Sequence, residues 1–300
     1  MNDALSEKVK MSIERIKAFE PEEGYYLSFS GGKDSVVCKA LLDMAGVKYD
    51  AHYRVTSVDP PELVQFIRKQ HPDVERDIPR YADGKPITMW NLIPKKLMPP
   101  TRLVRYCCSS LKESGGDGRM TVTGVRWAES VNRQRNQGLV TLIGKSVTKD
   151  LDSSDFTSTV RGGVVLTNDN ADSRRAVEAC YKRHKTTVNP IIDWEDRDVW
   201  DFIRSERIPY CELYNIGFHR LGCIGCPFAG TKDREHEFAL WPKYKIAYLK
   251  AFDRMLKERE RRGKMQGGTR MGNTPQSVFN WWMNYDILPG QMDLFEEDDT

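Results

Sequence analysis

The sequence of 300 residues lacks any apolar run long enough to cross a bilayer, which takes about 20 residues. Its opening segment, MNDALSEKVK, has no apolar core of the kind that a secretory signal needs. Neither charge sign dominates, since 46 Lys and Arg stand against 43 Asp and Glu, a net charge of +3. Binding of nucleic acid through bulk charge alone is therefore excluded. We expect a cytoplasmic protein without membrane contact.

Seven cysteines in such a chain are not expected to form a disulfide framework, which belongs to secreted proteins. Cys107 and Cys108 are adjacent, and Cys223 and Cys226 form a CxxC pair followed by Pro227. Two thiolates on one tight turn suit a metal ion or a cluster. An adjacent pair chelates one zinc ion poorly, and a redox CxxC leaves Cys107-Cys108 unexplained. The residues favour an iron–sulfur cluster, with zinc and a redox pair or buried thiols as alternatives.

Hydrophobic periodicity and turn residues predict that strands alternate with helices along the first two thirds of the chain. We expect helices over 3–19, 36–44, from 59 onward, after Asp193 as the capping residue, and at 275–284, and strands at 25–29, 49–58 and 120–125. This alternation predicts an α/β fold, a three-layer α/β/α sandwich with a mostly parallel sheet. Residues 139–168 resemble an inserted β hairpin, and the chain from residue 231 is expected to be helical.

The segment Ser-Gly-Gly-Lys-Asp-Ser lies between the strand expected at 25–29 and the helix that follows. Two glycines let the backbone approach a ligand closely, and the amides of the helix N-terminus point at an anion. The segment does not match a GxxxxGK[ST] loop, and no such loop occurs elsewhere. The sequence therefore predicts a phosphate-binding loop with the members Ser30, Gly31, Gly32, Lys33, Asp34 and Ser35.

SGGKDS resembles the pyrophosphate loop (PP-loop) of the adenine nucleotide alpha-hydrolase superfamily, whose enzymes cleave ATP between the α and β phosphates and adenylate a substrate. The resemblance implies that the loop amides, Ser30, Ser35 and Lys33 hold the phosphates, and that Asp34 organises the loop or a Mg²⁺ ion. Together with the expected strands and helices, it predicts a nucleotide-binding α/β domain over residues 1–230, which includes the cluster site, and a helical extension over 231–300.

Five segments in a fixed order resemble the phosphoadenosine phosphosulfate reductase family over residues 24 to about 230. They are SGGKDS, RYCC (105–108), GVRWAES (124–130), NPIIDWEDRDVW (189–200) and LYNIGFHRLGCIGC (213–226). The Cys-Cys and CxxC pairs are similar to the subset that carries a [4Fe–4S] cluster, which includes assimilatory adenylylsulfate reductases and the ATP pyrophosphatase of DNA phosphorothioation systems. The resemblance implies Cys107, Cys108, Cys223 and Cys226 as cluster ligands.

The same resemblance places Gly124 and Arg126 beside the nucleotide and makes Lys33, Asp34 and Arg126 the candidate catalytic residues. Glu129 and Arg133 would face the same cleft. One departure concerns the C-terminal nucleophilic Cys of sulfonucleotide reductases, because the 74 residues after Cys226 contain none. A covalent S-sulfo intermediate then has no evident attachment point in this sequence.

Other chemical groups are expected to have structural roles. Cys38 and Cys211 are interpreted as packed thiols, His52 as a structural strand residue, and the tryptophans as core or interface residues: Trp194, Trp200, Trp281 and Trp282. Cys180 lies in the basic stretch 174–185, which is expected to be a solvated face. Together with Arg102, Arg105, Arg133 and Arg135, this stretch is a candidate groove for a phosphate backbone.

These observations predict an ATP pyrophosphatase or adenylating enzyme of the sulfurtransferase type that contains a [4Fe–4S] cluster. The expected ligands are ATP with Mg²⁺, and the expected partners are a nucleic-acid acceptor (DNA or tRNA), a sulfur-donor protein such as a cysteine desulfurase, and a second copy of the chain. Two alternatives stay open: a sulfonucleotide reductase acting on adenylylsulfate or phosphoadenylylsulfate, and a non-catalytic nucleotide-binding module.

Overall fold

The computed structural model describes residues 2–113, 115–143, 156–158, 164–166, 185–264 and 271–283. The chain divides into two compact units, each assembled from separated stretches of sequence. Unit 1 comprises Met1–Arg54, Pro61–Asp77 and Ser114–Leu221, and unit 2 comprises Val55–Pro60, Ile78–Glu113 and Gly222–Thr300. Among the described residues, no helix combines the length and apolar character that spanning a membrane requires.

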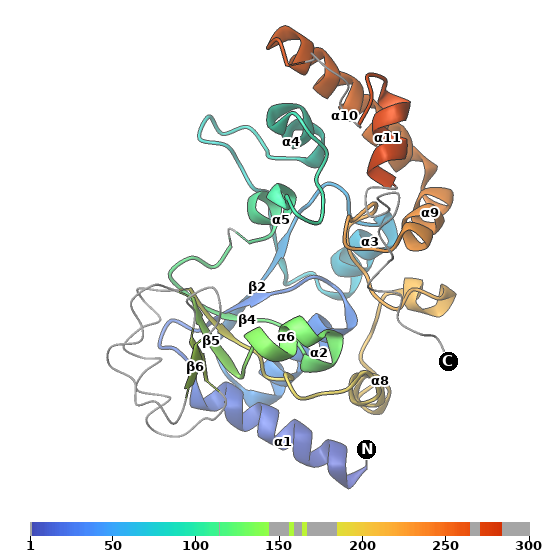
Figure 1. Cartoon of the computed structure of the whole chain (residues 1–300). Coiled ribbons are helices and arrows are strands. Elements are labelled where there is room, and N and C mark those ends of the chain that lie inside the picture. The colour runs from blue at the N-terminus through green and yellow to red at the C-terminus, as the bar shows by residue number, and fades with distance from the viewer. Residues whose placement is uncertain are drawn as a thin grey trace. The chain divides into compact units, whose positions relative to one another are not determined.

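Unit 1 is built on one sheet whose eight described strands have the order β3-β2-β1-β4-β8-β5-β7-β6 (Figure 1). The strands are β1 (Tyr25–Ser28), β2 (Tyr49–Arg54), β3 (Glu75–Asp77), β4 (Met120–Val122), β5 (Val140–Ile143), β6 (Phe156–Ser158), β7 (Val164–Leu166) and β8 (Lys185–Val188). The strands from β3 to β8 in this order pair in parallel. The predicted α/β class, a mostly parallel sheet with helices on both sides, is confirmed.

The β structure expected over 139–168 is present where the structure describes this range. Strands β5, β7 and β6 pair in antiparallel fashion, and β5 also pairs with β8, with Val140 opposite Val188. The expected hairpin therefore continues the main sheet instead of forming a separate appendage. The basic stretch 174–184, with Cys180, lies outside the described residues.

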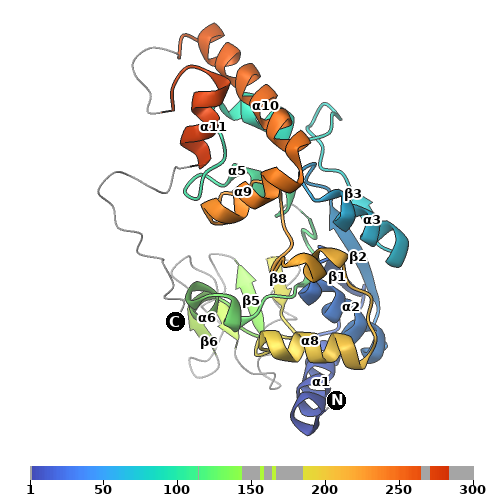
Figure 2. The ribbon, with the colours of Figure 1, turned by 90° about the vertical axis from the view of Figure 1, so that its right-hand side faces the viewer.

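Several helices accompany the sheet in unit 1, and the longer ones bury apolar residues. They are α1 (Asp3–Ala18), α2 (Lys33–Ala45), α3 (Pro61–Gln70), α6 (Val131–Asn136), α8 (Asp196–Ser205) and the 3-10 helices η1 (Trp127–Glu129) and η3 (Glu212–Ile216). Helix α2 contacts both α1 and α8, and Figure 2 shows the three grouped beside β1. Buried Ser12 joins α1 to the segment before α8, because its hydroxyl donates to Pro190 O (2.9 Å) and accepts from Trp194 Nε1 (3.1 Å).

Two predicted boundaries were wrong for identifiable reasons. The strand expected to reach residue 58 ends at Arg54, because residues 55–60 leave the sheet and join unit 2, where Val58 O accepts from Ile224 N (2.8 Å). The N-cap of α8 is Glu195 and not Asp193. Asp193 instead accepts two hydrogen bonds from Arg15, at 2.7 and 2.9 Å.

Unit 2 is helical in its described part, as expected for the C-terminal region. Its helices are α4 (Met89–Lys96), α5 (Tyr106–Leu111), α9 (Thr231–Leu240), α10 (Pro242–Arg261) and α11 (Pro275–Met283). Helix α10 packs on α4 and α11 (Figure 1). The core is aromatic: the Trp282 ring lies 4.7 Å from that of Tyr248 and 5.5 Å from that of Phe252, and its indole donates to Pro100 O (2.8 Å).

The sheet order reverses between β1 and β4. From β1 the chain moves to β2 and β3 on one side, and it later returns to β4 on the other. In open parallel sheets, the crevice at the carboxyl ends of two such strands is the usual place for a ligand. The predicted phosphate loop follows β1, and Gly124 and Arg126 follow β4. Both predicted elements therefore lie at the position where this topology favours binding.

Candidate functional site

The phosphate loop links β1 to α2 with a backbone that only glycine adopts easily at one point. Gly31 has a φ of +75°, and a Cβ there would lie 2.8 Å from the side chains of Leu63 and Ile67. The hydroxyls of Ser30 and Ser35 lie 3.2 Å apart, and that of Ser35 also donates to Gly32 O (2.9 Å). The two predicted serines thus hold the loop closed across its glycines.

The N-terminus of α2 keeps donors available for an anion. Gly32 is the N-cap, and no side chain caps the helix. The amide of Lys33 donates to Tyr214 Oη (2.9 Å), whereas those of Gly31 and Asp34 have no hydrogen-bond partner among the described residues. Amides without a partner at a helix start, together with the helix dipole, favour a negatively charged group. The loop is therefore suited to a phosphate or a sulfate.

A buried arginine connects the loop to two carboxylates. Arg126 is 2% exposed, and its guanidinium donates to Asp34 Oδ1 (2.7 Å), Asp196 Oδ1 (2.5 Å) and Trp194 O (3.2 Å). Burial opposes ionisation of Asp196, but the hydrogen bond from Arg126 and the charge of Lys33 outweigh it and lower the pKa of this carboxyl. The Asp196 carboxylate is therefore held ionised beside the guanidinium.

Lys33 completes this network. Its ammonium lies 3.7 Å from Asp34 Oδ2 and 3.5 Å from Asp196 Oδ1, and it donates to His219 O (3.3 Å). The residue is 5% exposed. The structure thus brings the predicted catalytic residues Lys33, Asp34 and Arg126 into one cluster, in which Asp34 is the acceptor that orients Arg126.

Two further cations lie near the cluster. Burial lowers the pKa of Arg133 first, and the charges of Arg220 and Arg126 lower it further. Arg133 also donates to Glu129, whose carboxylate accepts from the backbone N–H of Arg126 (3.0 Å). Like charges gathered this closely repel each other, so an anionic ligand would relieve the repulsion. Glu129 and Arg133 therefore lie close to the network around Arg126.

Several residues of this cluster were missed at the sequence level, namely Asp196, Tyr214, His219 and Arg220. All four lie inside segments that carry the family resemblance, NPIIDWEDRDVW and LYNIGFHRLGCIGC. The signal was present, but a single sequence does not say which residues of a segment reach the loop after β1. Burial raises the pKa of Tyr214 well above that of a free tyrosine, which keeps its hydroxyl protonated at neutral pH.

All four predicted cluster cysteines lie in unit 2. Cys107 and Cys108 stand on α5, and Cys223 and Cys226 flank a turn closed by the bond from Cys226 N to Cys223 O (3.1 Å). Each thiol of the CxxC pair acts electrostatically on Cys107, so the two sequence-distant pairs are brought together in space.

The CxxC turn is held from several sides. Gly225 has a φ of +71°, and a Cβ there would lie 2.7 Å from the Phe238 ring and 2.9 Å from the Trp282 ring. Its N–H donates to Glu237 Oε2 (2.7 Å), and Tyr248 Oη donates to Ile224 O (2.9 Å). The turn is therefore preformed by its packing against the aromatic core of unit 2.

The thiols of Cys107, Cys108 and Cys223 differ in the direction in which their pKa is shifted. The hydrogen bond between Cys107 and Cys108 lowers the pKa of Cys108 to about 6 and raises that of Cys107. Burial raises the pKa of Cys223 to about 11, against the attraction of Lys112. The charge of Cys223 in turn raises the pKa of the Lys112 amine. Binding of a metal centre by all four sulfurs would supply the positive charge that buried thiolates require.

The spacing of the thiols distinguishes between the candidate metal groups. Zn–S bonds of 2.3 Å in a tetrahedral site place the sulfurs about 3.8 Å apart. In the described part of the chain, no three cysteines have all their sulfurs within 4.8 Å of one another. An iron–sulfur cube binds each thiolate at a separate iron corner and accepts a wider set. The four residues therefore fit a [4Fe–4S] cluster better than one zinc ion.

The other described cysteines lack reactive surroundings. Cys38 and Cys211 are both fully buried, and burial raises the pKa of each thiol. Both positions agree with the interpretation of packed thiols. Of the tryptophans, Trp194 and Trp282 are core residues, as expected, with 0% and 1% exposed.

A model of the phosphoadenosine phosphosulfate reductase domain matches residues 24–229, more than half of the chain. The chain belongs to this family. It is 24% identical over 234 residues to an uncharacterized protein of Methanocaldococcus jannaschii, covering 73% of this chain and 38% of that protein. It is 39% identical over 54 residues to adenosine 5'-phosphosulfate reductase of Allochromatium vinosum, covering 18% of this chain and 21% of that enzyme. The chain thus spans less than half the length of these curated relatives.

Solved structures with a related arrangement show 12–14% identity. Phosphoadenylyl-sulfate reductase of Candida auris gives a TM-score of 0.40 over 74% of this chain and 96% of that one. FMN adenylyltransferase of Candida glabrata gives a TM-score of 0.41 over 74% of this chain and 64% of that one.

Proposed function

We propose that the protein is a PP-loop ATP pyrophosphatase that adenylates an acceptor in a sulfur-transfer reaction and carries a [4Fe–4S] cluster. The observation that carries the proposal is the network of Lys33, Asp34, Arg126 and Asp196 around the loop after β1. It gathers buried positive charge and available amides at the switch point of a parallel sheet. Such a site suits a nucleoside triphosphate with its Mg²⁺ ion.

The proposed reaction is a displacement at the α-phosphorus of ATP, and this geometry supports it. A nucleophilic oxygen of the acceptor attacks the α-phosphorus and forms a new P–O bond, while the bridging P–O bond to the β-phosphate breaks. Pyrophosphate leaves with the electrons of that bond, and a Mg²⁺ ion bound with the triphosphate would offset its negative charge. The loop amides and Lys33 stabilise the charge that develops on the leaving group. Arg126, oriented by Asp34 and Asp196, keeps the positive field fixed before substrate binds.

In this proposal Cys107, Cys108, Cys223 and Cys226 bind the cluster. When bound, the cluster would either bind the sulfur that is to be transferred or stabilise the fold of unit 2. Lys112 and the buried turn around Gly225 would balance and position the thiolates.

The proposed acceptor is a nucleic acid, DNA or tRNA, and the proposed sulfur source is a donor protein such as a cysteine desulfurase. Support for the acceptor comes from helix α10 of unit 2, which carries seven Lys and Arg against three Asp and Glu. A local excess of this kind attracts a phosphate backbone even when the whole chain is near neutrality.

Pyrophosphate release by anaerobically purified protein tests the proposed reaction. ATP, Mg²⁺, nucleic acid and a desulfurase with cysteine are supplied, and released pyrophosphate is counted. Lys33→Met is expected to lower the rate at least about 100-fold, because it removes fixed charge from the leaving group. Lys39→Met is the matched control, since Lys39 lies on the same helix and pairs with Asp73 (3.0 Å). Absence of release with DNA and with tRNA would refute the proposal.

Iron content and visible absorbance test the cluster separately. Replacement of any of the four cysteines by Ser is expected to lower bound iron and the iron–sulfur absorption band. Cys211→Ser, a buried thiol outside the set, is the control. A full iron complement in all four variants would contradict the assignment.

A second candidate is reduction of adenylylsulfate, favoured by the local similarity to adenosine 5'-phosphosulfate reductases. A sulfate group fits the same cationic loop. The buried thiols of Cys38 and Cys211 do not suit the nucleophile that this reaction needs, since burial raises the pKa of both. Release of sulfite from adenylylsulfate with thioredoxin as reductant would favour this candidate over pyrophosphate chemistry.

A further inference from the structure

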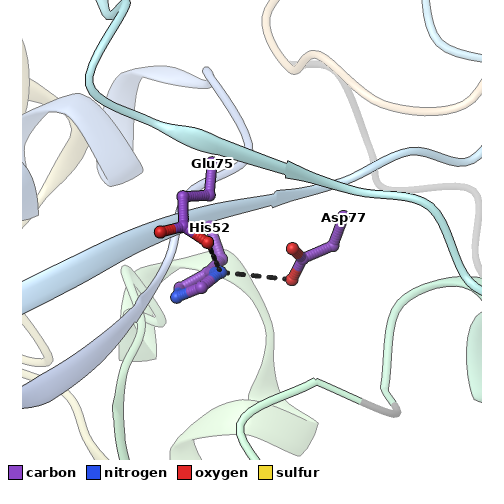
Figure 3. A group of neighbouring side chains, drawn as sticks. All are labelled: His52, Glu75 and Asp77. Atoms are coloured by element: carbon purple, nitrogen blue, oxygen red, sulfur yellow. Dashed lines mark ion pairs between the residues drawn. The ribbon is translucent and has the colours of Figure 1, made fainter.

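A histidine and two carboxylates meet at the edge of the sheet in unit 1, outside the phosphate loop and the cysteines. His52 lies on β2, and Glu75 and Asp77 lie on the neighbouring strand β3, where His52 pairs with Glu75 in register. Figure 3 shows both carboxylates turned toward the same ring nitrogen. His52 Nδ1 lies 3.7 Å from Glu75 Oε2 and 3.2 Å from Asp77 Oδ2.

The ligand atoms have the spacing of a metal site. One atom from each of the three residues lies within 4.8 Å of the other two. With metal–nitrogen and metal–oxygen bonds of about 2.0–2.2 Å, tetrahedral ligands lie about 3.4 Å apart. The two measured distances from Nδ1 fall on either side of this value. An ion placed among the three side chains can therefore reach all of them without a large rearrangement.

The histidine ring is held in place by stacking, but its nitrogens lack hydrogen bonds within the described residues. It stacks on Tyr26 with the ring centroids 4.2 Å apart and the planes 9° from parallel. Both ring nitrogens are buried, and neither makes a hydrogen bond within the described part of the chain. Because Asp77 Oδ2 is close to Nδ1 without forming such a bond, it does not lie along the N–H direction. A metal ion on the lone-pair axis would bind Nδ1 and the flanking carboxylates together.

A second layer of contacts orients the carboxylate. Tyr26 Oη donates to Asp77 Oδ2 (3.2 Å), and Arg54 Nη1 lies 3.9 Å from the same oxygen. Outer-shell donors of this kind typically orient metal ligands.

We propose that His52, Glu75 and Asp77 form a binding site for a divalent transition-metal ion of the zinc class. An imidazole with two carboxylates suits Zn²⁺ and its neighbours, whereas Mg²⁺ and Ca²⁺ prefer oxygen ligands throughout. The ion would tie the short edge strand β3 to β2. This site is independent of the proposed nucleotide chemistry and of the cysteine cluster.

Titration of the full-length protein with Co²⁺ tests the site, because cobalt reports its ligands. Thiolate ligands give intense sulfur-to-cobalt charge-transfer bands in the near ultraviolet, and a nitrogen and oxygen set gives only weak visible bands. We expect one equivalent of Co²⁺ with the second signature, displaced by Zn²⁺. His52→Gln and Asp77→Asn should weaken this binding at least about tenfold.

The controls separate a metal site from a plain ion pair. Asp50 lies on the same strand as His52 and pairs with Arg119 (2.6 Å). The Asp50→Asn variant should therefore bind Co²⁺ as the wild type does. Glu75→Gln keeps the test valid if His52→Gln fails to fold, since the Glu75 side chain is 69% exposed. Zn²⁺ should raise the melting temperature of the wild type and of Asp50→Asn but not of Glu75→Gln. Absence of saturable Co²⁺ binding, binding with thiolate bands alone, or binding unchanged in His52→Gln and Asp77→Asn would each overturn the proposal.

Discussion

Gly124 lies against Asp34 so closely that a Cβ on Gly124 would be 2.8 Å from Asp34 Cβ and 2.9 Å from its carbonyl carbon. The neighbour is backbone at the start of α2 and cannot turn away as a long side chain can. The second residue after β4 is therefore a glycine, because the phosphate loop after β1 occupies the space beside it. This contact couples the two predicted elements of the nucleotide site.

Gly124→Ala is expected to push the phosphate loop out of place. Overpacking of this kind costs about 1–3 kcal/mol of unfolding free energy, and nucleotide affinity should fall about tenfold or more. Urea unfolding and nucleotide titration measure the two effects. Gly222→Ala is the control, because no atom lies within 4 Å of a Cβ there. Equal behaviour of the two variants would refute the steric argument.

Arg126→Met is expected to destabilise unit 1 by about 3 kcal/mol, because it leaves Asp34 and Asp196 without their shared buried partner. Nucleotide binding should be lost at the same time, since the positive field at the loop disappears. Arg197→Met removes an arginine that is 83% exposed, and its effect should stay within about 0.5 kcal/mol. A stable Arg126→Met protein that binds nucleotide normally would contradict the role of the network.

Gly225→Ala is expected to disturb the CxxC turn by strain at a positive φ and by collision with the rings of Phe238 and Trp282. The cost is about 1–3 kcal/mol, and the variant should hold less iron than the wild type after anaerobic reconstitution. Iron and sulfide assays give the result. Gly222→Ala, in the same loop, should reconstitute fully, and a complete cluster in Gly225→Ala would count against the preformed turn.

Asp193→Asn tests how α1 is attached. Burial opposes ionisation of Asp193, but the hydrogen bonds from Arg15 outweigh it and lower the pKa of the carboxyl. Its contribution is thus present above the unfolded pKa, near 3.8, and is lost as the pH falls through the lower folded value. At pH 7 the variant should lose about 2 kcal/mol.

The difference between wild type and Asp193→Asn should shrink when unfolding is measured at decreasing pH below about 4. Asp201→Asn is the control, because Asp201 is a surface carboxylate paired with Arg204 (2.6 Å), and it should leave stability close to that of the wild type. A difference for Asp193→Asn that does not depend on pH would show that the ion pair is not its source.

Local patterns predicted much of unit 1 because they express short-range physics. The periodicity of residues 3–19 and the aromatic run at 25–29 correspond to α1 and β1 almost to the residue. The strand expected over 49–58 was too long. Thr56 and Val58 are β-branched residues of the kind that favours strands, but they are buried in unit 2 and not in the sheet. Burial in a different unit is a long-range fact that periodicity does not contain.

The sequence by itself determined the α/β class, the loop at 30–35 and the four cysteines that stand in pairs, since turn chemistry, spacing and residue type express them directly. Only the tertiary structure decided that Asp34 and Asp196 both pair with Arg126, although the two carboxylates are about 160 residues apart in the sequence. It also decided that His52, interpreted as a plain strand residue, faces two carboxylates. Strand register and side-chain direction place such groups together, and they depend on the whole sheet.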